Sequence, residues 1–242
     1  MCGRFIQYAS GDQLAERFYL PVAPDLISRY NVAPSQPVGV IRIAAEGRRE
    51  WVALRWGLIP TWSPEPRTSY STINARAETV ADKPAYRQAF RRRRCLIPAD
   101  GFYEWRSMGN RKQPYCIAPA DGEPVAFAGL WERWERDGQA LESCTILITQ
   151  ANTLIASIHD RMPVILDPAD EARWLDPAVA DPAAPQALLV PCPPERLRLW
   201  PVGAAVNVPR RDGPDLMAAV ALPPPDGGSG AGQCFLHSDG KP

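Results

Sequence analysis

The sequence predicts an α+β fold with a largely antiparallel, barrel-like β core and a few short helices. Two observations predict it: short runs rich in β-branched and aromatic residues recur between turn signals, and helical patterns between them are few. A third observation concerns size: 242 residues with 45% hydrophobic content can bury a real core, as one large domain or a tight pair. We favour one domain.

Four short helices are predicted from caps and proline positions. In chain order they are a helix opened by Ser10-Gly11-Asp12-Gln13 through Leu14 and Phe18, one from Asp82-Lys83-Pro84 through Tyr86 and Phe90, one over Asn152–Ile158, and one from Asp167-Pro168 through Glu171 and Trp174. Seven strands are predicted between them, at Val38–Ile43, Trp51–Trp56, Cys95–Ile97, Gly101–Trp105, Tyr115–Ile117, Val125–Leu130 and Thr145–Thr149.

The domain is expected to cover residues 2–217, and residues 218–242 are expected to form a flexible tail. The tail prediction rests on its richness in proline and glycine, which opposes regular packing. Cys234 and His237 lie in it, and we expect no chemistry from them. The sequence has no internal repeat.

Charge and hydropathy patterns exclude several classes of protein. Lysine plus arginine and aspartate plus glutamate each number 27, so net charge gives no argument for a nucleic-acid partner. The basic run Arg91–Arg94 fits a solvated helix end at least as well as a phosphate contact. With no apolar run of membrane length and no signal peptide, we expect a soluble, cytoplasmic protein.

The cysteines indicate reduced thiols rather than a metal site. There are six, with no Cys-x-x-Cys pair and no Cys/His cluster of zinc spacing, so we expect no metal. Cys95, Cys116 and Cys144 lie in apolar, strand-like runs and are predicted to pack in the core.

Cys2 is the exception, because of its position. A methionine before so small a residue is readily removed, and we expect Cys2 to become the N-terminus. Its α-amine would then titrate near ~7.7–8.0 and its thiol near ~8.5, so both nucleophiles are partly available at neutral pH. Such a 1,2-aminothiol can attack an amide, or condense with an aldehyde to an imine that the thiol closes into a thiazolidine. Position alone does not show which, since most residues near a terminus have no chemical role.

Six segments, taken together, resemble the SRAP family, the SOS response-associated peptidases or abasic-site processing proteins of bacteria and eukaryotes. They are Met1–Phe5, Arg29–Pro34, Trp56–Trp62, Ile73–Thr79, Ala99–Trp105 and Ile158–Pro163, and the resemblance covers residues 2–217. Each motif alone is weak, but six in this order are hard to produce by chance.

The resemblance implies a covalent response to DNA damage. It implies that Cys2 forms a thiazolidine with the ring-opened aldehyde of an abasic site in single-stranded DNA, a crosslink that shields the lesion. It also implies a monomer that needs no cofactor and no metal, works on the bacterial nucleoid, and carries a peptidase label from removal of Met1. Whether the protein or an aminopeptidase removes Met1 stays open, as do a lyase side reaction and reversal of the crosslink.

Three further catalytic residues follow from the matched motifs. Glu104 is expected to handle protons as the sugar opens and the carbinolamine loses water, and His159 to donate a proton to the sugar oxygen or to support reversal. Asn74 is expected to hold the Cys2 amine and the sugar in attack geometry. Without the resemblance these would be a strand glutamate, a loop histidine and a turn asparagine.

The DNA-binding residues expected from the resemblance accept any sequence around the lesion. Backbone phosphates suit arginine forks, and flanking bases suit an apolar wedge. The residues are Arg4, Arg76, Arg161, Asn31, Pro34 and Trp62. Close relatives carry two adjacent tryptophans where this chain has Trp62-Ser63, so the strength of the wedge is in question. Trp56 and Trp105 are expected in the core.

Two other classes of function stay open on the residues alone. An N-terminal-nucleophile amidohydrolase or peptidase would use Cys2 on an amide, with Asn74 as an oxyanion donor. It gives Trp62 and Glu104 no role. A non-catalytic single-stranded-DNA-binding module would use the aromatic and arginine residues, but it does not explain Cys2.

Overall fold

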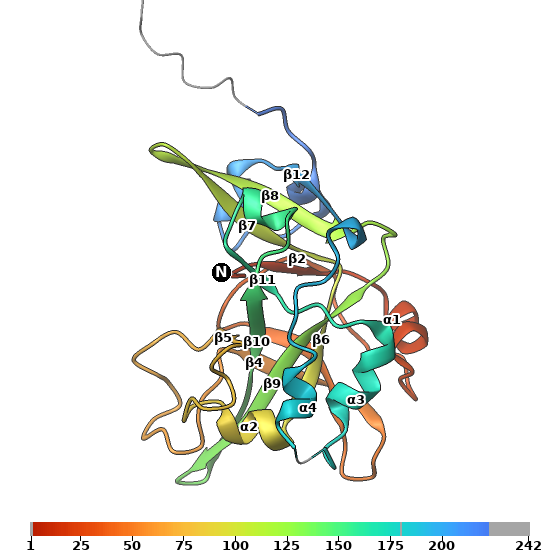
Figure 1. Cartoon of the computed structure of the whole chain (residues 1–242), viewed down its shortest axis with the longest axis vertical. Coiled ribbons are helices and arrows are strands. Elements are labelled where there is room, and N and C mark those ends of the chain that lie inside the picture. Colours follow the sequence, from red (N-terminus) through yellow and green to blue (C-terminus); the bar gives the residue numbers. More distant parts are fainter. Residues whose placement is uncertain (1, 180, 223–242) are drawn as a thin grey trace, which may run out of the picture.

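The computed structural model describes residues 2–179 and 181–222, and it folds them around two sheets (Figure 1). The smaller sheet has the strand order β12-β8-β7-β1-β2. Its strands are β1 (Phe5–Gln7), β2 (Arg29–Val32), β7 (Gly101–Met108), β8 (Arg111–Pro119) and β12 (Leu197–Pro201). All of its pairings are antiparallel.

The larger sheet has the order β11-β10-β4-β3-β6-β9, and β5 also pairs with β10. Its strands are β3 (Pro37–Ile43), β4 (Arg49–Trp56), β5 (Asn74–Arg76), β6 (Arg94–Ala99), β9 (Val125–Arg136), β10 (Gln139–Gln150) and β11 (Arg161–Pro163). Because β10 also pairs with β9, the sheet curls into a barrel-like shape. The pairing of β10 with β4 spans only Ser143 and Cys144, so the barrel is not fully closed. The predicted fold class is confirmed.

β10 has one neighbour that is made of two separate pieces of chain. Ser143 and Cys144 pair in parallel with the end of β4, and Ile146 to Ile148 pair in parallel with β5. The amide of Gly57 bonds the carbonyl of Cys144 at 2.9 Å, and the amide of Ile146 bonds the carbonyl of Ile73 at 3.1 Å. The intervening chain leaves the sheet as a loop, residues 57–73, which we call the β4–β5 loop.

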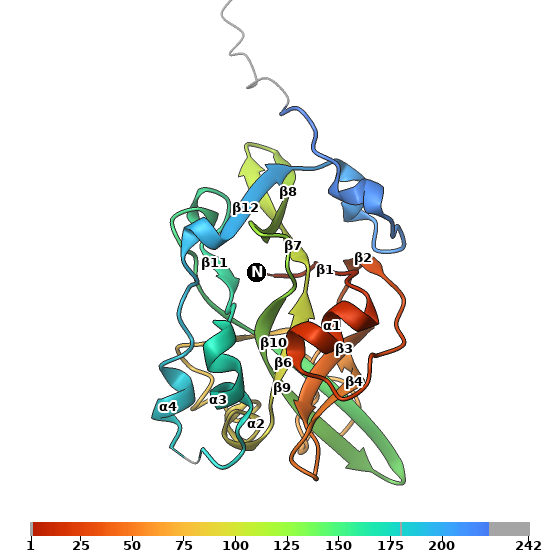
Figure 2. The ribbon, with the colours of Figure 1, turned by 90° about the vertical axis from the view of Figure 1, so that its right-hand side faces the viewer.

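The helices are short and lie against one face of the larger sheet (Figure 2). They are α1 (Gly11–Phe18), α2 (Arg87–Arg92), α3 (Glu171–Leu175) and α4 (Ala183–Gln186), with 3-10 turns at Ile155–Ser157, Pro168–Asp170, Pro194–Arg196, Ala204–Asn207 and Pro214–Met217. None of the described helices is long and apolar enough to span a bilayer.

The capping box before α1 is confirmed: Ser10 accepts from the amide of Gln13, and the Gln13 side chain accepts from the amide of Ser10. The predicted helix over Asn152–Ile158 is wrong. Only a 3-10 turn forms there, because the Asn152 side chain caps the amide of Ile155 and the chain turns again at His159, whose amide bonds the Ile155 carbonyl. Similarly, the second helix begins at Arg87, after a series of turns.

All seven predicted strands form, and several are longer than predicted. The strands that the sequence did not indicate, β1, β2, β5, β11 and β12, have at most five residues each. Such segments are too short for alternation of polar and apolar residues to be recognised, and long-range pairing defines them. The site is built on two of these, β1 and β5.

The core between the two sheets is aromatic. Phe5 of β1 packs edge-on against Trp56, with ring centroids 5.2 Å apart, and Phe127 lies edge-on to both Phe5 and Phe102. Trp56 is buried as predicted, and Trp105 is half-buried, with its indole N–H donating to Asn207. Among the described residues, the cysteines Cys2, Cys95, Cys116, Cys144 and Cys192 are all buried free thiols.

The basic run at the end of α2 divides into two parts. Arg91 and Arg92 are exposed, as a solvated helix end should be. Arg93 pairs with Glu132 at 2.7 Å, and Arg94 is buried, with its guanidinium donating to the carbonyls of Trp174, Phe90, Arg91 and Asp176. Arg93 and Arg94 therefore stabilise the fold.

The ordered chain continues past the boundary predicted at residue 217. Ala219 forms an antiparallel bridge with Val202, and the amide of Val220 bonds the Pro201 carbonyl at 3.0 Å. The first residues assigned to the tail thus lie against β12. Cys234 and His237 fall outside the described residues.

Candidate active site

Cys2 lies three residues before β1 and is fully buried, in the core cluster that also contains Phe5 and Trp56. The side-chain amide of Asn74, the first residue of β5, donates to the Cys2 carbonyl at 2.9 Å. On the other side, β1 pairs with β7, with Phe5 opposite Phe102, and the amide of Tyr103 bonds the Arg4 carbonyl at 3.0 Å. Both sheets therefore fix the position of Cys2.

The surroundings of Cys2 keep its thiol protonated. Burial raises the pKa of the thiol well above its ordinary value, and the charge of the Glu104 carboxylate raises it further. The S–H points toward the Arg4 carbonyl at 3.9 Å, a long and weak contact. Because the thiol is a poor nucleophile in this form, a nearby base has to take its proton when it reacts.

Glu104, the residue predicted to handle protons, lies on the neighbouring strand. It lies in β7, opposite Tyr115 of β8, and is 2% exposed. Its charge reaches Cys2, as the effect on the thiol pKa shows. A buried carboxyl group is unusual in a structural core, because removing it from water is costly.

The second polar atom of the Asn74 side chain is also buried. This atom, Oδ1, has no hydrogen-bond partner among the described residues. The Nδ2 of the amide therefore holds the Cys2 backbone, and the Oδ1 is available to accept a hydrogen bond from a ligand or from an amine. The backbone of Asn74 is held as well, since the Tyr86 hydroxyl donates to its carbonyl at 3.4 Å.

His159 lies half-buried beside Arg161, after the 3-10 turn. Its Nδ1 accepts from the Arg161 amide at 3.0 Å and lies 2.9 Å from a carboxylate oxygen of Asp160. The two contacts make opposite demands on Nδ1. Asp160 is 83% exposed and open to water, so the contact with the Arg161 amide is the stronger of the two. With Nδ1 as the acceptor, Nε2 is the ring nitrogen that can donate.

Arg76 and Arg161 flank the end of β10 from opposite sides. Arg76 of β5 lies opposite Ile148, and Arg161 of β11 lies opposite Gln150. Glu78 joins them by an ion pair with Arg161. Burial would raise the pKa of Glu78, but hydrogen bonds from a backbone amide and Arg161, with the charge of Arg76, lower it. Glu78 was not among the predicted site residues, although it lies inside one of the matched motifs.

A cleft of about 570 Å³ opens beside Asn74. Its walls combine aromatic rings, two cations and small polar residues, and include two of the predicted DNA-binding residues. They are Trp62, Tyr70, Asn74, Arg76, Thr79, Lys83, Pro84, Ala85 and Tyr86. Burial, and to a lesser extent Tyr70, raises the pKa of Tyr86 to about 12, so its hydroxyl stays a hydrogen-bond donor. Tyr70, Lys83 and Tyr86 were not singled out from the sequence.

The other predicted contacts fall in three settings. Arg4 is half-buried, burial lowers its pKa, and its buried Nε has no partner among the described residues. Trp62 is 57% exposed, and Pro34 is half-buried in the turn after β2. Asn31 is fully buried, its Nδ2 donates to the carbonyls of Val206, Val208 and Arg211, and its Oδ1 has no partner among the described residues. Three hydrogen bonds thus tie its side chain to the fold.

Asn74 thus bonds the Cys2 backbone, and the charge of Glu104 acts on the Cys2 thiol. Arg76 and Arg161 lie on two strands that both pair with β10. The described residues contain no group of three or more His, Cys, Asp or Glu side chains suited to hold a metal ion.

Known proteins resemble the chain over nearly all of its length. The family model described as SOS response associated peptidase (SRAP) matches residues 1–209. The abasic site processing protein YoqW of Bacillus subtilis is 41% identical over 90% of this chain and 99% of its own length. The abasic site processing protein YoaM, from the same organism, is 39% identical over 90% and 98%.

A crystal structure of a protein from Bacteroides thetaiotaomicron superimposes with a TM-score of 0.81 at 27% identity, covering 91% of this chain and all of that one.

Proposed function

The chain belongs to the SRAP family, and from that premise we propose that it processes abasic sites in DNA. Two similar proteins of the family carry that activity in their names. The coarse function rests on this kinship. The chemistry rests on the residues of this chain itself, within the proposed domain of residues 2–217.

We infer that Cys2, once freed of Met1, makes the covalent bond. Its amine adds to the aldehyde carbon of the ring-opened abasic sugar, and the carbinolamine loses water to give an imine. The thiol then adds to the imine carbon and its proton passes to the nitrogen, which closes a thiazolidine. Atoms balance with one water released, and no oxidant, metal or cofactor takes part.

Glu104 supplies the proton transfers that this sequence needs. The sugar must open, the carbinolamine must lose hydroxide as water, and a thiol held protonated by burial must give up its proton. A single carboxyl group near Cys2 serves each step in turn, as acid and then as base. This placement of a buried carboxylate against a buried N-terminal cysteine is the observation that carries the proposal.

Asn74 and His159 take supporting roles in the proposal. Asn74 fixes the Cys2 carbonyl and offers its unpartnered Oδ1 to the amine. His159 offers its Nε2 proton to the sugar oxygen, and the same group would serve a lyase reaction or reversal of the crosslink.

The strand is held by its phosphates and by stacking. Arg76 and Arg161 present two cations at the end of β10, and Arg4 presents a buried N–H donor that suits an anion. Trp62 offers an exposed ring to a flanking base, with Pro34 as a second apolar contact. None of these contacts reads a base edge, so the lesion rather than the sequence is recognised.

The test is intact mass of the purified protein before and after incubation with a single-stranded oligonucleotide carrying one abasic site. We expect loss of Met1, then a stable adduct of the summed masses less one water. Cys2→Ala should abolish the adduct, and Cys95→Ala, another buried thiol, should keep it. An adduct on protein that retains Met1 would contradict the aminothiol chemistry.

The same samples separate the two rival functions. A chain without Met1 that forms no adduct but hydrolyses small amides would be an N-terminal-nucleophile hydrolase. Binding that is unchanged in Cys2→Ala, with no adduct in either protein, would indicate a simple DNA-binding module. Cleavage of the strand at the abasic site would reveal lyase activity. Retention of Met1 in Glu104→Gln, but not in Cys95→Ala, would indicate that the protein removes Met1 itself.

A further inference from the structure

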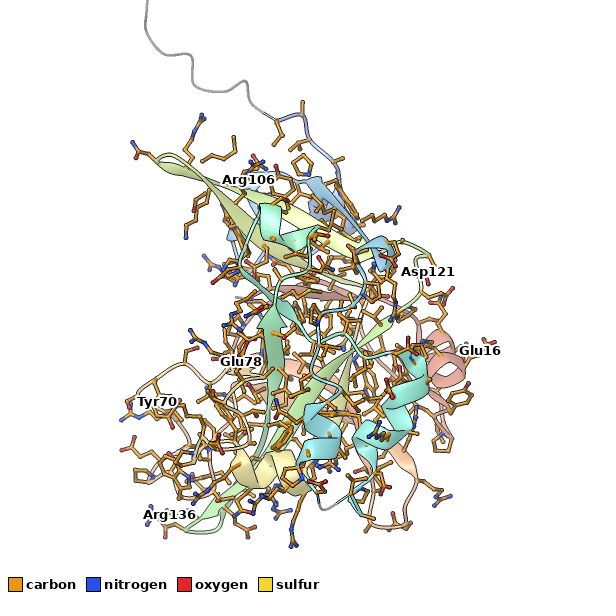
Figure 3. The ribbon with its side chains drawn as sticks, in the orientation of Figure 1. Glu16, Tyr70, Glu78, Arg106, Asp121 and Arg136 are labelled. Carbon is orange, nitrogen blue, oxygen red and sulfur yellow. The ribbon has the colours of Figure 1, made fainter. Side chains whose placement is uncertain are left out.

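The β4–β5 loop presents two large aromatic side chains to solvent. Trp62 is 57% exposed and Tyr70 is 49% exposed. Both line the cleft beside Asn74, and both also line a neighbouring hollow of about 500 Å³ formed by the loop itself. Figure 3 shows Tyr70 on this loop, which stands out beside β10. The two rings therefore mark the boundary between two adjoining hollows.

The residue after Trp62 does not contribute to the exposed surface. Ser63 is 4% exposed, and its hydroxyl donates to the Arg67 carbonyl at 3.0 Å. Its own carbonyl accepts from the indole N–H of Trp134 on β9 at 2.9 Å. Position 63 thus anchors the loop to the sheet. In this chain, a second exposed ring beside Trp62 has to come from elsewhere in the loop.

Tyr70 is held in position at the cleft. The Thr68 hydroxyl donates to its carbonyl at 2.6 Å, which fixes the backbone of the turn. Its phenol lies close enough to Tyr86 to affect the ionisation of that side chain, and Tyr86 in turn bonds the Asn74 carbonyl. Tyr70 is therefore linked through Tyr86 and Asn74 to Cys2.

The charge of the two hollows favours an anionic strand. None of the residues lining the cleft is acidic, and Arg76 and Lys83 are both basic. In the neighbouring hollow the acidic residue Glu65 is paired with Arg67. An exposed ring beside cations is the arrangement that single-stranded nucleic acids require, since phosphates meet the charges and bases stack on the ring.

We propose that Tyr70 stacks on an unpaired base that flanks the abasic position and acts as the second aromatic contact beside Trp62. This inference rests on the proposed function and adds a residue that positions the strand. Stacking accepts every base, so Tyr70 strengthens binding without making it sequence-dependent.

The test measures non-covalent affinity by fluorescence anisotropy. The probe is a single strand carrying tetrahydrofuran, which has no aldehyde and cannot crosslink. Tyr70→Ala should weaken binding by about 5- to 150-fold, the range expected for loss of one stacked base. Tyr70→Phe and Tyr70→Trp should bind like the wild type, because the ring makes the contact.

A distant tyrosine provides the matched control. Tyr19 is 79% exposed and lies at the end of α1 with a left-handed backbone (φ 54°), a conformation that asparagine tolerates. Tyr19→Asn should leave the affinity unchanged.

Removing bases from the DNA separates stacking from a structural effect. The bases on each side of the tetrahydrofuran are replaced, one at a time, by further tetrahydrofuran units. When the base that stacks on Tyr70 is the one replaced, the wild type should lose affinity. On that strand, Tyr70→Ala and the wild type should bind equally. An equal effect of Tyr70→Ala on every strand would overturn the proposal, as would no effect on any. Adduct formation by the wild type on a true abasic site, measured separately, shows whether the proposed function itself holds.

Discussion

The carboxylate of Glu104 lies within electrostatic reach of the Cys2 thiol, where β1 meets β7. Burial raises the pKa of the thiol, and the charge of Glu104 raises it further. The thiol therefore stays protonated beside this carboxylate, and it has to lose its proton before it can act as a nucleophile.

Replacing Glu104 by Gln separates the two effects of this carboxylate. Loss of the charge lowers the pKa of the thiol, so the pH midpoint for alkylation of Cys2 should move to lower pH. Adduct formation should nevertheless slow by about 10²- to 10⁴-fold, because the group that moves protons is gone. A variant whose thiol titrates at lower pH and which also crosslinks at the wild-type rate would exclude Glu104 as the proton handler.

Replacing Asn31 by Ala should affect stability and not binding. Its amide donates to the carbonyls of Val206, Val208 and Arg211, and these would lose their partner in the interior. We expect a loss of about 1–3 kcal/mol in the free energy of unfolding, measured in urea, with DNA affinity unchanged. Val208→Ala keeps the backbone carbonyl and trims a 44% exposed side chain, so it is the control. Weakened DNA binding at full folding would restore Asn31 to the interface.

Replacing Arg94 by Ala should destabilise the fold strongly. Its buried guanidinium donates hydrogen bonds to four backbone carbonyls, those of Phe90, Arg91, Trp174 and Asp176. The loss leaves them without donors and is expected to be about 3–5 kcal/mol. Arg91→Ala, on the exposed part of the same run, should stay within about 0.5 kcal/mol of the wild type. Equal unfolding midpoints in urea for the two variants would contradict the division of the run.

Replacing Asp100 by Asn should remove one pH-dependent contribution to stability. Burial raises the pKa of Asp100 above its ordinary 3.8, although its carboxylate accepts from the amides of Tyr8 and Ala9. Its folded pKa exceeds its unfolded pKa, so the folded state binds more protons between the two values and stability falls as pH rises through them.

The free energy of unfolding of the wild type should therefore fall relative to that of Asp100→Asn as the pH rises above about 4. Urea unfolding of both proteins at a series of pH values measures it. A difference that shifts in favour of the wild type as pH rises would show that the two amide bonds outweigh burial.

The sequence predicted the long strands because their patterns are local. The runs around Val125 and Thr145 are apolar enough to show strands before any partner is known. β1 and β5 are three residues each, and nothing in Phe5–Gln7 or Asn74–Arg76 alone indicates a strand. They exist because β7 and β10 supply the hydrogen bonds.

For the site, the motifs singled out Cys2, Asn74 and Glu104, and the structure brings the segments that carry them together. The burial of Asn31 was not predictable, because a motif does not show whether an amide faces a ligand or the interior. Tyr70 was missed because a loop residue without periodicity gives no signal before its exposure and neighbours are known.

The two-piece neighbour of β10 also bears on how related proteins can diverge. Gly57 and Ile73 bond β10 on either side of Thr145, and within the β4–β5 loop Ile59 and Ser63 are also bonded to the sheet. Insertions or deletions after Ser63 and before Ile73 need not disturb the hydrogen bonds of β10. The frame around Cys2 and the rim of the cleft can therefore be altered separately, and chains of this kind can change the lining of the cleft while keeping the surroundings of Cys2.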